Sequence, residues 1–385
     1  MSDLVIRPVL TKADRKRFVD LVWDVYKDDP YWVPPLKDEM LGLITPGKNP
    51  WFEHAEAALW LAERKGKAVG RISAQVDRLV LEHMGAGTGN WGMFELLDGE
   101  TEAGPKLIAT AEQWLRDRQM TRSLGPLSLS IWDEPGLLVQ GFEESPTAMM
   151  GHHRPSYQAI VEGAGYEKAK DLVTYELDIR AKMIPMIQRL IDAGNRSGRI
   201  RIRAVDKKRY AEDSRTILEL LNDAWSDNWG FVPLTEAEIA YAGKKLKPII
   251  YEDLVCIAEV KNDAGVFEPA AFMITIPDLN ELTRDLNGEL FPFGFVKLLW
   301  RMRKPKVKRM RVPLMGVAKK YQGGRLSAQL AFMMIERNRV ASTGPYGATH
   351  GEFGWVLEDN QGMLSIAQLP GAEVNKTYRI YEKAL

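Results

Sequence analysis

The chain has 385 residues, of which 45% are hydrophobic and 27% are charged, as in an ordinary globular protein. Its 52 Lys and Arg balance its 52 Asp and Glu, so the overall charge gives no indication of a nucleic-acid partner. The single cysteine, Cys256, permits no internal disulfide, and we expect it to be buried in a strand because it lies in the apolar run Leu254–Ala258. We expect no signal peptide, and there is no apolar run of about 18 residues. We therefore expect a cytoplasmic protein of two domains.

The two halves of the chain open with the same order of elements. Each has a short alternating strand, an amphipathic helix, and two apolar runs joined by a glycine-bearing turn, which predicts a β-hairpin. In the first half these elements fall at residues 4–9, 18–25, 57–62 and 68–74. In the second half they fall at residues 200–205, 217–225, 254–260 and 269–276.

Between the halves, Gly194-Asn-Arg-Ser-Gly198 has the composition of a linker. We expect a first domain at residues 1–180, a connecting helix and loop at residues 181–198, and a second domain at residues 199–385. Strands and helices alternate in both halves, so the fold class is mixed α/β.

The second half contains a glycine loop between a strand and a helix. The β-type run Met310–Val317 ends in the polar loop Tyr321-Gln-Gly-Gly324, and an apolar stretch with helical spacing begins at Leu326. Backbone N–H groups in such a loop can hold a phosphate at the positive end of the helix dipole. A plain turn is the alternative.

The corresponding connection in the first half differs. It carries Asp98, Glu100 and Glu102, and it has no cluster of glycines near the start of the helix that follows. Carboxylates beside a pyrophosphate would repel it by several kcal/mol at short range. We therefore expect only the second half to bind such a group.

The order of strand, Tyr-Gln-Gly loop and helix resembles the GNAT superfamily of acyl-CoA-dependent acyltransferases. A β-type run at residues 351–357 and an Asn before the last helix, Asn360, add to the resemblance. Arg325 and Ser327 depart from it, because the superfamily pattern has glycine, and glycine or alanine, at those positions.

Further segments extend the resemblance to bacterial tandem GNAT-like proteins over almost the whole chain. Among them are Asp29-Pro-Tyr-Trp-Val-Pro-Pro, Gly125-Pro-Leu-Ser-Leu-Ser-Ile-Trp-Asp-Glu and Trp355-Val-Leu-Glu-Asp-Asn. The sequence is also similar to bacterial ceramide synthases, which are N-acyltransferases of sphingoid bases.

The resemblance implies two tandem GNAT domains, of which the second binds acyl-CoA and the first shapes the acceptor pocket. The implied cofactor-binding residues are Val317, Gln322, Gly323, Gly324, Arg325, Leu326 and Ser327. The implied reaction is transfer of an acyl group to a lipidic or long-chain amine. Two other functions stay open: a catalytically silent acyl-CoA-binding or scaffold protein, and an N-acetyltransferase of a small soluble amine or a protein N-terminus.

Acyl transfer to an amine requires a general base. His350 and Glu352 alternate on a β-type run, so both lie on one face of that strand and are candidates, with Asn360 as a third catalytic residue implied by the resemblance. Solvated edge residues are the alternative. The tyrosine that superfamily members often use as acid is missing, because its expected place falls near Gln368 and Tyr378 comes too late.

For the acceptor we expect contacts from Asp133, Glu134 and His152 in the first half. The paired carboxylates could hold an amine or could instead cap the next element. The adjacent histidines His152 and His153 have no third ligand at metal spacing, so we expect no metal.

Residues 290–311 form an aromatic, apolar stretch that runs directly into basic residues. From Lys297 to Arg311 there are eight Lys or Arg and no acid. This composition is typical of an interfacial anchor on an anionic membrane surface. The alternative is a core helix followed by a charged loop, and a nucleic-acid patch is disfavoured by the balanced net charge.

Overall fold

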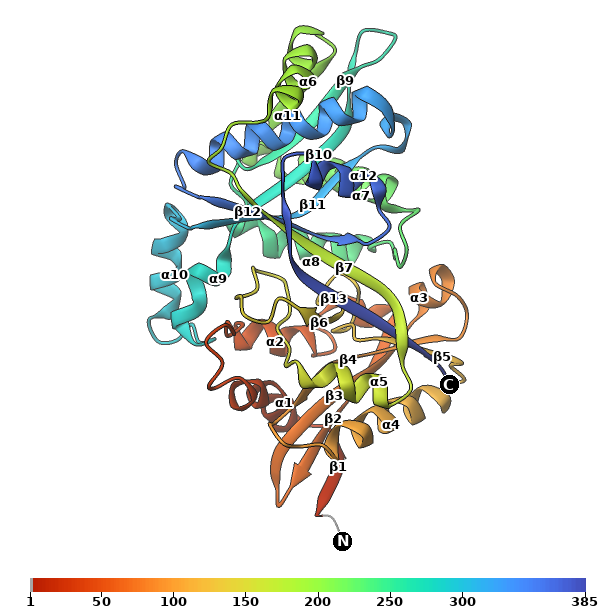
Figure 1. Ribbon diagram of the computed structural model, residues 1–385. Coiled ribbons are helices and arrows are strands. Elements are labelled where there is room, and N and C mark those ends of the chain that lie inside the picture. The colour runs from red at the N-terminus through yellow and green to blue at the C-terminus, as the bar shows by residue number, and fades with distance from the viewer. Residues whose placement is uncertain (1–2) are drawn as a thin grey trace.

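A mixed sheet of thirteen strands runs through both halves of the chain in the computed structural model, which describes residues 3–385 (Figure 1). The first half contributes β1 (Leu4–Pro8), α1 (Lys12–Val25), α2 (Lys37–Leu43), β2 (Ala55–Arg64), β3 (Lys67–Asp77), α3 (Arg78–His83), β4 (Thr88–Leu96), α4 (Ala103–Arg116), β5 (Arg122–Gly125), β6 (Leu137–Gln140), α5 (Ser156–Gly163) and β7 (Glu167–Asp178).

The second half largely repeats this order of elements. It contributes α6 (Pro185–Arg196), β8 (Ile200–Ala204), α7 (Tyr210–Trp225), α8 (Glu236–Leu246), β9 (Val255–Lys261), β10 (Phe267–Pro277), α9 (Leu279–Thr283), α10 (Gly294–Arg303), β11 (Arg309–Val317), α11 (Gly324–Thr343), β12 (His350–Leu357), α12 (Gln361–Gln368) and β13 (Glu373–Ala384). The predicted strand, helix and hairpin at the start of each half are confirmed, as is the mixed α/β class.

The last strand of each half pairs with the other half. The strand order is β1-β2-β3-β4-β5-β13-β7-β12-β11-β10-β9-β8, with β6 also paired to β13. The C-terminal β13 therefore lies between β5 and β7, while β7 lies between β13 and β12. Figure 1 shows the two long strands crossing between the halves. The division into domains at residues 1–180 and 199–385 stays a prediction, and the exchange shows that each half needs the other to complete its sheet.

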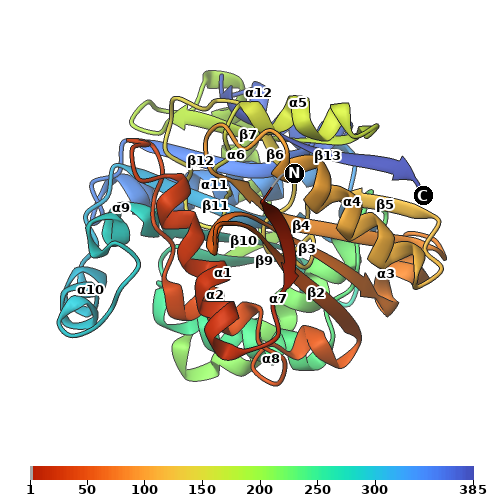
Figure 2. The same cartoon turned by 90° about the horizontal axis from the view of Figure 1, so that it is seen from below.

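Helices cover both faces of the sheet in each half. In the second half, α7 packs through Leu221 on Ile257 and Phe272, and α11 packs on the opposite face through Leu330 and its neighbours. In the first half, α1 and α4 have these positions, as Figure 2 shows. Cys256, expected to be buried, lies under α11. None of the helices within residues 3–385 combines the length and the apolar character needed to cross a bilayer.

Tyr381 allows the strand exchange to be tested. This residue of β13 is fully buried in the core of the first half, and its hydroxyl donates to Glu162 Oε1 at 3.1 Å. We expect Tyr381→Ala to cost about 3–5 kcal/mol of unfolding free energy, the usual cost of deleting a buried aromatic ring. Tyr381→Phe should cost only about 1 kcal/mol, because it loses one hydrogen bond. Chemical denaturation measures both, and a cost below 1 kcal/mol for the alanine variant would contradict the exchange.

Candidate functional site

β11 and β12 pair over only four residues and then separate. Their parallel register runs from Arg309 opposite His350 to Val312 opposite Phe353. Pro313 follows immediately, and it has no N–H with which to continue a ladder. The pairing of β11 with β10 also shifts register at this point. The sequence therefore ends the ladder where the two strands diverge.

An apolar cleft occupies the space between the diverging strands. Side chains of α11 and α12 supply further walls of this cleft. Apolar side chains that line it include Met310, Met315, Ile335, Phe353, Leu357 and Met363. Among the described residues that line the cleft, Glu352 is the one acidic residue and Arg339 the one basic residue, and the side chain of Glu352 is fully buried. Such a cleft suits a long hydrocarbon chain better than a polar ligand.

The N-terminus of α11 is open to solvent. Gly323 and Gly324 are exposed and have φ angles of 79° and 68°, and no atom lies within 4 Å of a Cβ built on either. No side chain caps this helix, so its first N–H groups are available to an anion. Gln322 holds the loop to the end of β11, since its Nε2 donates to the carbonyl of Val317 at 2.9 Å. The structure thus brings the residues predicted to bind the cofactor, from Val317 to Ser327, to one place.

The equivalent groove in the first half is filled by the chain itself. β4 and β5 also pair in parallel over a short stretch and then part. The backbone N–H of Leu127 donates to Trp91 O at 2.7 Å, and Gln75 Nε2 donates to Leu127 O at 2.7 Å. A Cβ on Gly92 would lie 1.8 Å from that carbonyl oxygen. No ligand can enter a groove so closely packed with backbone.

The helix that follows β4 also begins in a packed environment. A Cβ on Gly104, in the first turn of α4, would lie 2.8 Å from Ile160 Cγ2 and 3.0 Å from Leu96 Cδ1. The acidic residues before it are held by Arg64, which pairs with Glu100 at 2.9 Å. The two halves therefore share a scaffold but only the second offers an open helix start.

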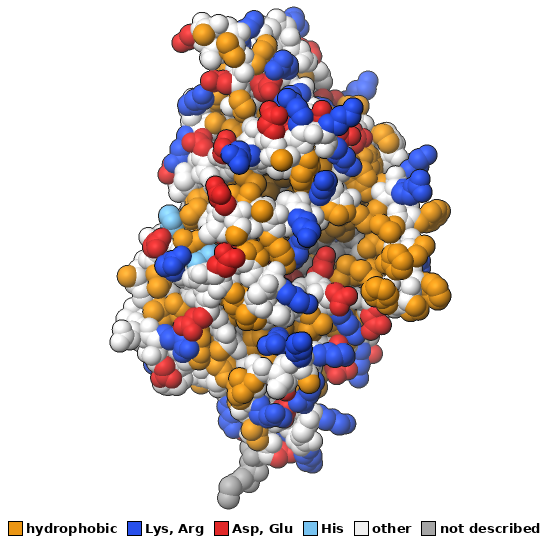
Figure 3. All heavy atoms as spheres, turned by 180° about the vertical axis from the view of Figure 1, so that it is seen from behind, with side chains coloured by type: hydrophobic (Ala, Val, Ile, Leu, Met, Phe, Trp, Pro, Cys, Tyr) orange, Lys and Arg blue, Asp and Glu red, His pale blue; other side chains and the backbone are white. Residues whose placement is uncertain are grey.

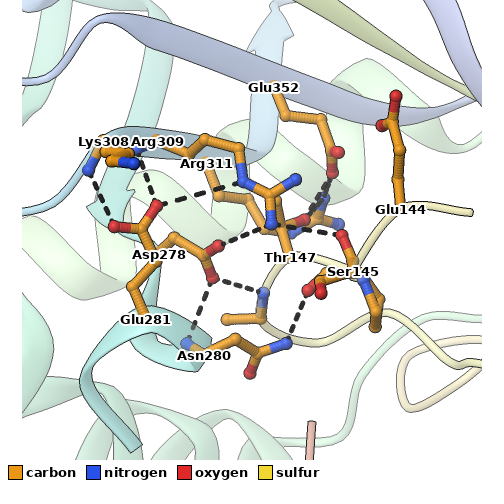
Figure 4. A network of polar contacts seen from close by, with 12 residues as sticks. Glu144, Ser145, Thr147, Asp278, Asn280, Glu281, Lys308, Arg309, Arg311 and Glu352 are labelled. Carbon is orange, nitrogen blue, oxygen red and sulfur yellow. Dashed lines mark hydrogen bonds and ion pairs between the residues drawn. The ribbon is translucent and has the colours of Figure 1, made fainter. Parts of the chain in front are cut away.

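Glu352 lies at the centre of a buried polar network (Figure 4). Its Oε1 accepts from Arg311 Nη1 at 2.9 Å and from the hydroxyl of Thr147, and its Oε2 accepts from Asn375 Nδ2 at 2.7 Å. The side chain of Asn375 is oriented by Thr174, whose hydroxyl donates to Asn375 Oδ1 at 2.6 Å. A carboxylate has about four acceptor positions, so these three bonds leave one position unfilled.

The loop that carries Thr147 comes from the first half and is held by the second. Asp278 Oδ1 accepts from the backbone N–H of Ala148 at 2.9 Å, and Asn280 Nδ2 donates to Pro146 O at 2.8 Å. Arg309 Nη2 donates to Ser145 O at 3.1 Å and lies 3.3 Å from Asp278. Burial raises the pKa of Asp278 to about 6. These contacts fix Thr147 against Glu352.

Lys376 closes the same interface from β13. Its side chain is almost fully buried, and its Nζ donates to the backbone carbonyls of Gly141 and Glu144. Burial lowers the pKa of Lys376 to about 8. Glu176, opposite Glu352 in the sheet, has its pKa raised by burial. Residues of both halves and both exchanged strands therefore meet around Glu352.

The other predicted catalytic residues lie in different settings. His350 shares a strand face with Glu352 but does not line the cleft, and its Nδ1 lies 2.9 Å from Thr349 Oγ1. Asn360 lines the cleft, and its side chain caps α12 by accepting from the N–H of Met363 at 3.1 Å. His350 therefore contacts its neighbour Thr349, and Asn360 caps α12.

The structure does not bring the predicted acceptor-binding residues to the cleft. Asp133 accepts from Ser130 Oγ at 2.7 Å, a contact within its own loop. Glu134 accepts from Ser128 at 3.4 Å in the same loop. His152 is buried, with Nε2 2.9 Å from Asp29 Oδ2. Within residues 3–385, no group of three or more His, Cys, Asp or Glu side chains is arranged to hold a metal ion.

Sequence reasoning did not single out Arg311, Thr147 or Asn375. Arg311 was counted with the basic run that ends there, whereas it is buried against Glu352. One signal was available: Arg309 and Arg311 alternate with the apolar Met310 and Val312, the period of a strand with one polar face. Thr147 and Asn375 carry no comparable local pattern.

Known proteins show where this architecture recurs. The chain is 42% identical over 385 residues to the bacterial ceramide synthase of Caulobacter vibrioides, covering 100% of this chain and 98% of that protein. It is 38% identical over 389 residues to protein YghO of Escherichia coli K12, covering 99% and 95%. No family model matches the chain.

Two solved structures share the fold over nearly their full length. One is a tandem GNAT protein from the clavulanic acid biosynthesis pathway, with a TM-score of 0.55, 14% identity, and coverage of 99% and 98%. The other is a GCN5-related N-acetyltransferase from Sphaerobacter thermophilus, with a TM-score of 0.52, 15% identity, and coverage of 100% and 96%. These matches confirm the tandem GNAT fold.

The buried pair of Arg311 and Glu352 has a predictable energetic signature. Arg311→Met leaves Glu352 charged and without its cation, so we expect a loss of about 3–5 kcal/mol of unfolding free energy. The double variant Arg311→Met/Glu352→Gln removes both charges and should recover a large part of that loss. Chemical denaturation of the wild type, both single variants and the double variant gives the coupling energy. Additive losses would show that the two side chains do not interact.

Proposed function

Because the chain belongs to the family of tandem GNAT acyltransferases that includes the bacterial ceramide synthase of Caulobacter vibrioides, we propose that it transfers a long-chain acyl group from acyl-CoA to a lipidic amine. A sphingoid base is the amine that this relative's name favours. One contrast carries the proposal: the cleft between β11 and β12 is open, whereas the groove between β4 and β5 is filled.

The proposed donor site runs from the N-terminus of α11 into the cleft. The pyrophosphate lies against the N–H groups that follow Gly323, with Arg325 and the exposed Lys319 and Lys320 nearby in sequence. The acyl chain lies along the apolar walls. The apolar lining of the cleft favours a long acyl group over an acetyl group, which would leave most of this surface uncovered.

The proposed acceptor site lies on the Glu352 side of the cleft. The unfilled acceptor position of Glu352 binds the amine and takes its proton, while Arg311, Thr147 and Asn375 hold the carboxylate in place. The amine nitrogen then forms the bond to the thioester carbon as the carbon–sulfur bond breaks, and the second proton that the nitrogen loses passes through water to the leaving thiolate. In this proposal the first half contributes Thr147 and the loop around it to the acceptor pocket.

A CoA-release assay tests the proposed function. Thiol release from a long-chain acyl-CoA should require a long-chain amine and should be at least tenfold slower with a polyamine or a peptide N-terminus. Equal rates with all three amines would favour acylation of soluble amines. Tight acyl-CoA binding without thiol release would favour a silent binding protein.

The charge at the start of α11 should control donor binding. We expect Arg325→Glu to weaken acyl-CoA binding at least tenfold, because a carboxylate replaces a cation beside the pyrophosphate. The fold should tolerate the change, since Arg325 is exposed and an acid favours a helix N-terminus. Lys106→Glu makes the same reversal in the first turn of α4 and should leave binding unchanged. Calorimetry measures both, and equal effects of the two variants would contradict the assignment.

Removal of the Glu352 carboxylate should impair turnover more than binding. We expect Glu352→Gln to lower kcat by about 10²–10⁴ while the affinity for acyl-CoA changes little. Glu352→Asp keeps the charge but retracts it, so it should fold and still lose turnover. Glu176→Gln, on the neighbouring strand and outside the cleft lining, is the matched control. Steady-state kinetics on folded protein decides, and a normal kcat in Glu352→Gln would exclude Glu352 as the base.

A further inference from the structure

The helix α10 and the turn before it expose an unusual concentration of apolar side chains. Phe291, Phe293 and Trp300 are 74%, 78% and 76% exposed, and no other segment of the described chain gathers side chains of this size so openly. Phe295, Val296 and Leu299 are also exposed. Figure 3 shows them as a projecting hydrophobic patch on one side of the molecule. We call these six residues the α10 patch.

The α10 helix has apolar side chains both on the side that faces the core and on the side that faces solvent. Leu298 and Met302, four residues apart, pack inward on a core cluster that contains Leu282, Val307 and Met310. On the outward side, Phe295 and Leu299 are also four residues apart. Because the core side of α10 is already packed, folding of the chain does not explain the exposed phenylalanine and tryptophan side chains. Exposed apolar patches of this kind mark interaction surfaces.

Basic residues border the patch on its C-terminal side. Arg303, Lys304, Lys306 and Lys308 are exposed, and no acid occurs between Lys297 and Arg311. The basic run is smaller than its sequence suggests, because Lys297 and Arg301 pair with Asp285, and Arg309 and Arg311 belong to β11. Among the described residues, none of the four exposed cations pairs with an acid, and Lys306 Nζ donates to the backbone carbonyl of Pro345 at 2.6 Å.

We propose that the α10 patch docks the protein on an anionic lipid bilayer, an inference that rests on the proposed lipidic acceptor. Phe291, Phe293 and Trp300 enter the headgroup region, and the four basic residues meet the lipid charges. A second copy of the chain fits the surface less well, because a two-fold contact would bring the same basic residues together without acidic partners.

The patch is close to the donor cleft through the core beneath it. The inward residues of α10 share a cluster with Ile179 and Met310, and both of these also line the cleft. Docking through α10 thus places this end of the cleft one layer of side chains from the docked helix.

Vesicle sedimentation tests the docking surface without relying on activity. Wild-type protein should bind vesicles containing phosphatidylglycerol at low salt and bind pure phosphatidylcholine vesicles much more weakly. Binding should also fade in 1 M salt, where the Debye length falls from about 10 Å at 0.1 M to about 3 Å. Failure of the wild type to sediment with anionic vesicles would overturn the proposal.

Two groups of variants separate the apolar and basic contributions. Phe291→Ser/Phe293→Ser/Trp300→Ser and, separately, Arg303→Ser/Lys304→Ser should each weaken binding to anionic vesicles at least tenfold. The matched controls, Leu10→Ser/Val266→Ser/Val340→Ser and Lys65→Ser/Lys67→Ser, remove exposed residues elsewhere and should bind as wild type. If patch and control variants lose binding equally, the α10 patch is not the docking surface.

A further pair of measurements separates this inference from the proposed function. The patch variants should keep wild-type CoA release with a long-chain amine dissolved in detergent and lose it with the same amine in vesicles. Loss of both activities would place α10 in the catalytic fold and contradict a docking role. If the protein binds vesicles but acylates no amine, the docking surface is supported and the proposed reaction is contradicted. A concentration-dependent dimer that the patch variants abolish would assign the surface to a second copy instead.

Discussion

The divergence of β11 and β12 is the constraint on which the functional half depends. A parallel ladder needs backbone donors, and Pro313, directly after the last paired residue, has no N–H to offer. The separation opens the cleft between the strands and leaves Glu352 on its wall. It also positions the end of β11, from which the glycine loop leads into α11. The apolar cleft and the open helix start thus follow from one interrupted ladder.

The two halves share a scaffold but differ in the space between their diverging parallel strands. In the second half the space between the strands is open, and in the first half the backbone around Leu127 fills it. The first half nevertheless reaches the site, because its loop at residues 145–148 is held by Asp278, Asn280 and Arg309. The filled half therefore acts as a wall and a source of polar contacts.

Local patterns in the sequence predicted much of this architecture, and long-range pairing set the limit. The hairpins, the glycine loop and the burial of Cys256 follow from spacing and composition within a few residues. The exchange of β7 and β13 does not, because alternation in a strand reveals its faces but not its neighbours. Arg311 was missed for a related reason: a charge run and a polar strand face look alike until Glu352 is known to lie opposite. Period two correctly put His350 and Glu352 on one face, but only the fold decides which of them meets the cleft.

The position of β13 has a consequence for biosynthesis. The strand that covers β5 of the first half is β13, which follows all the other strands in chain order. While the chain is being made, β5 keeps an unpaired edge until β13 has left the ribosome, and such edges are prone to pair with other chains. The half that is synthesised first is thus completed last. A nascent chain that stalls before β13 leaves exposed the core in which Tyr381 should lie.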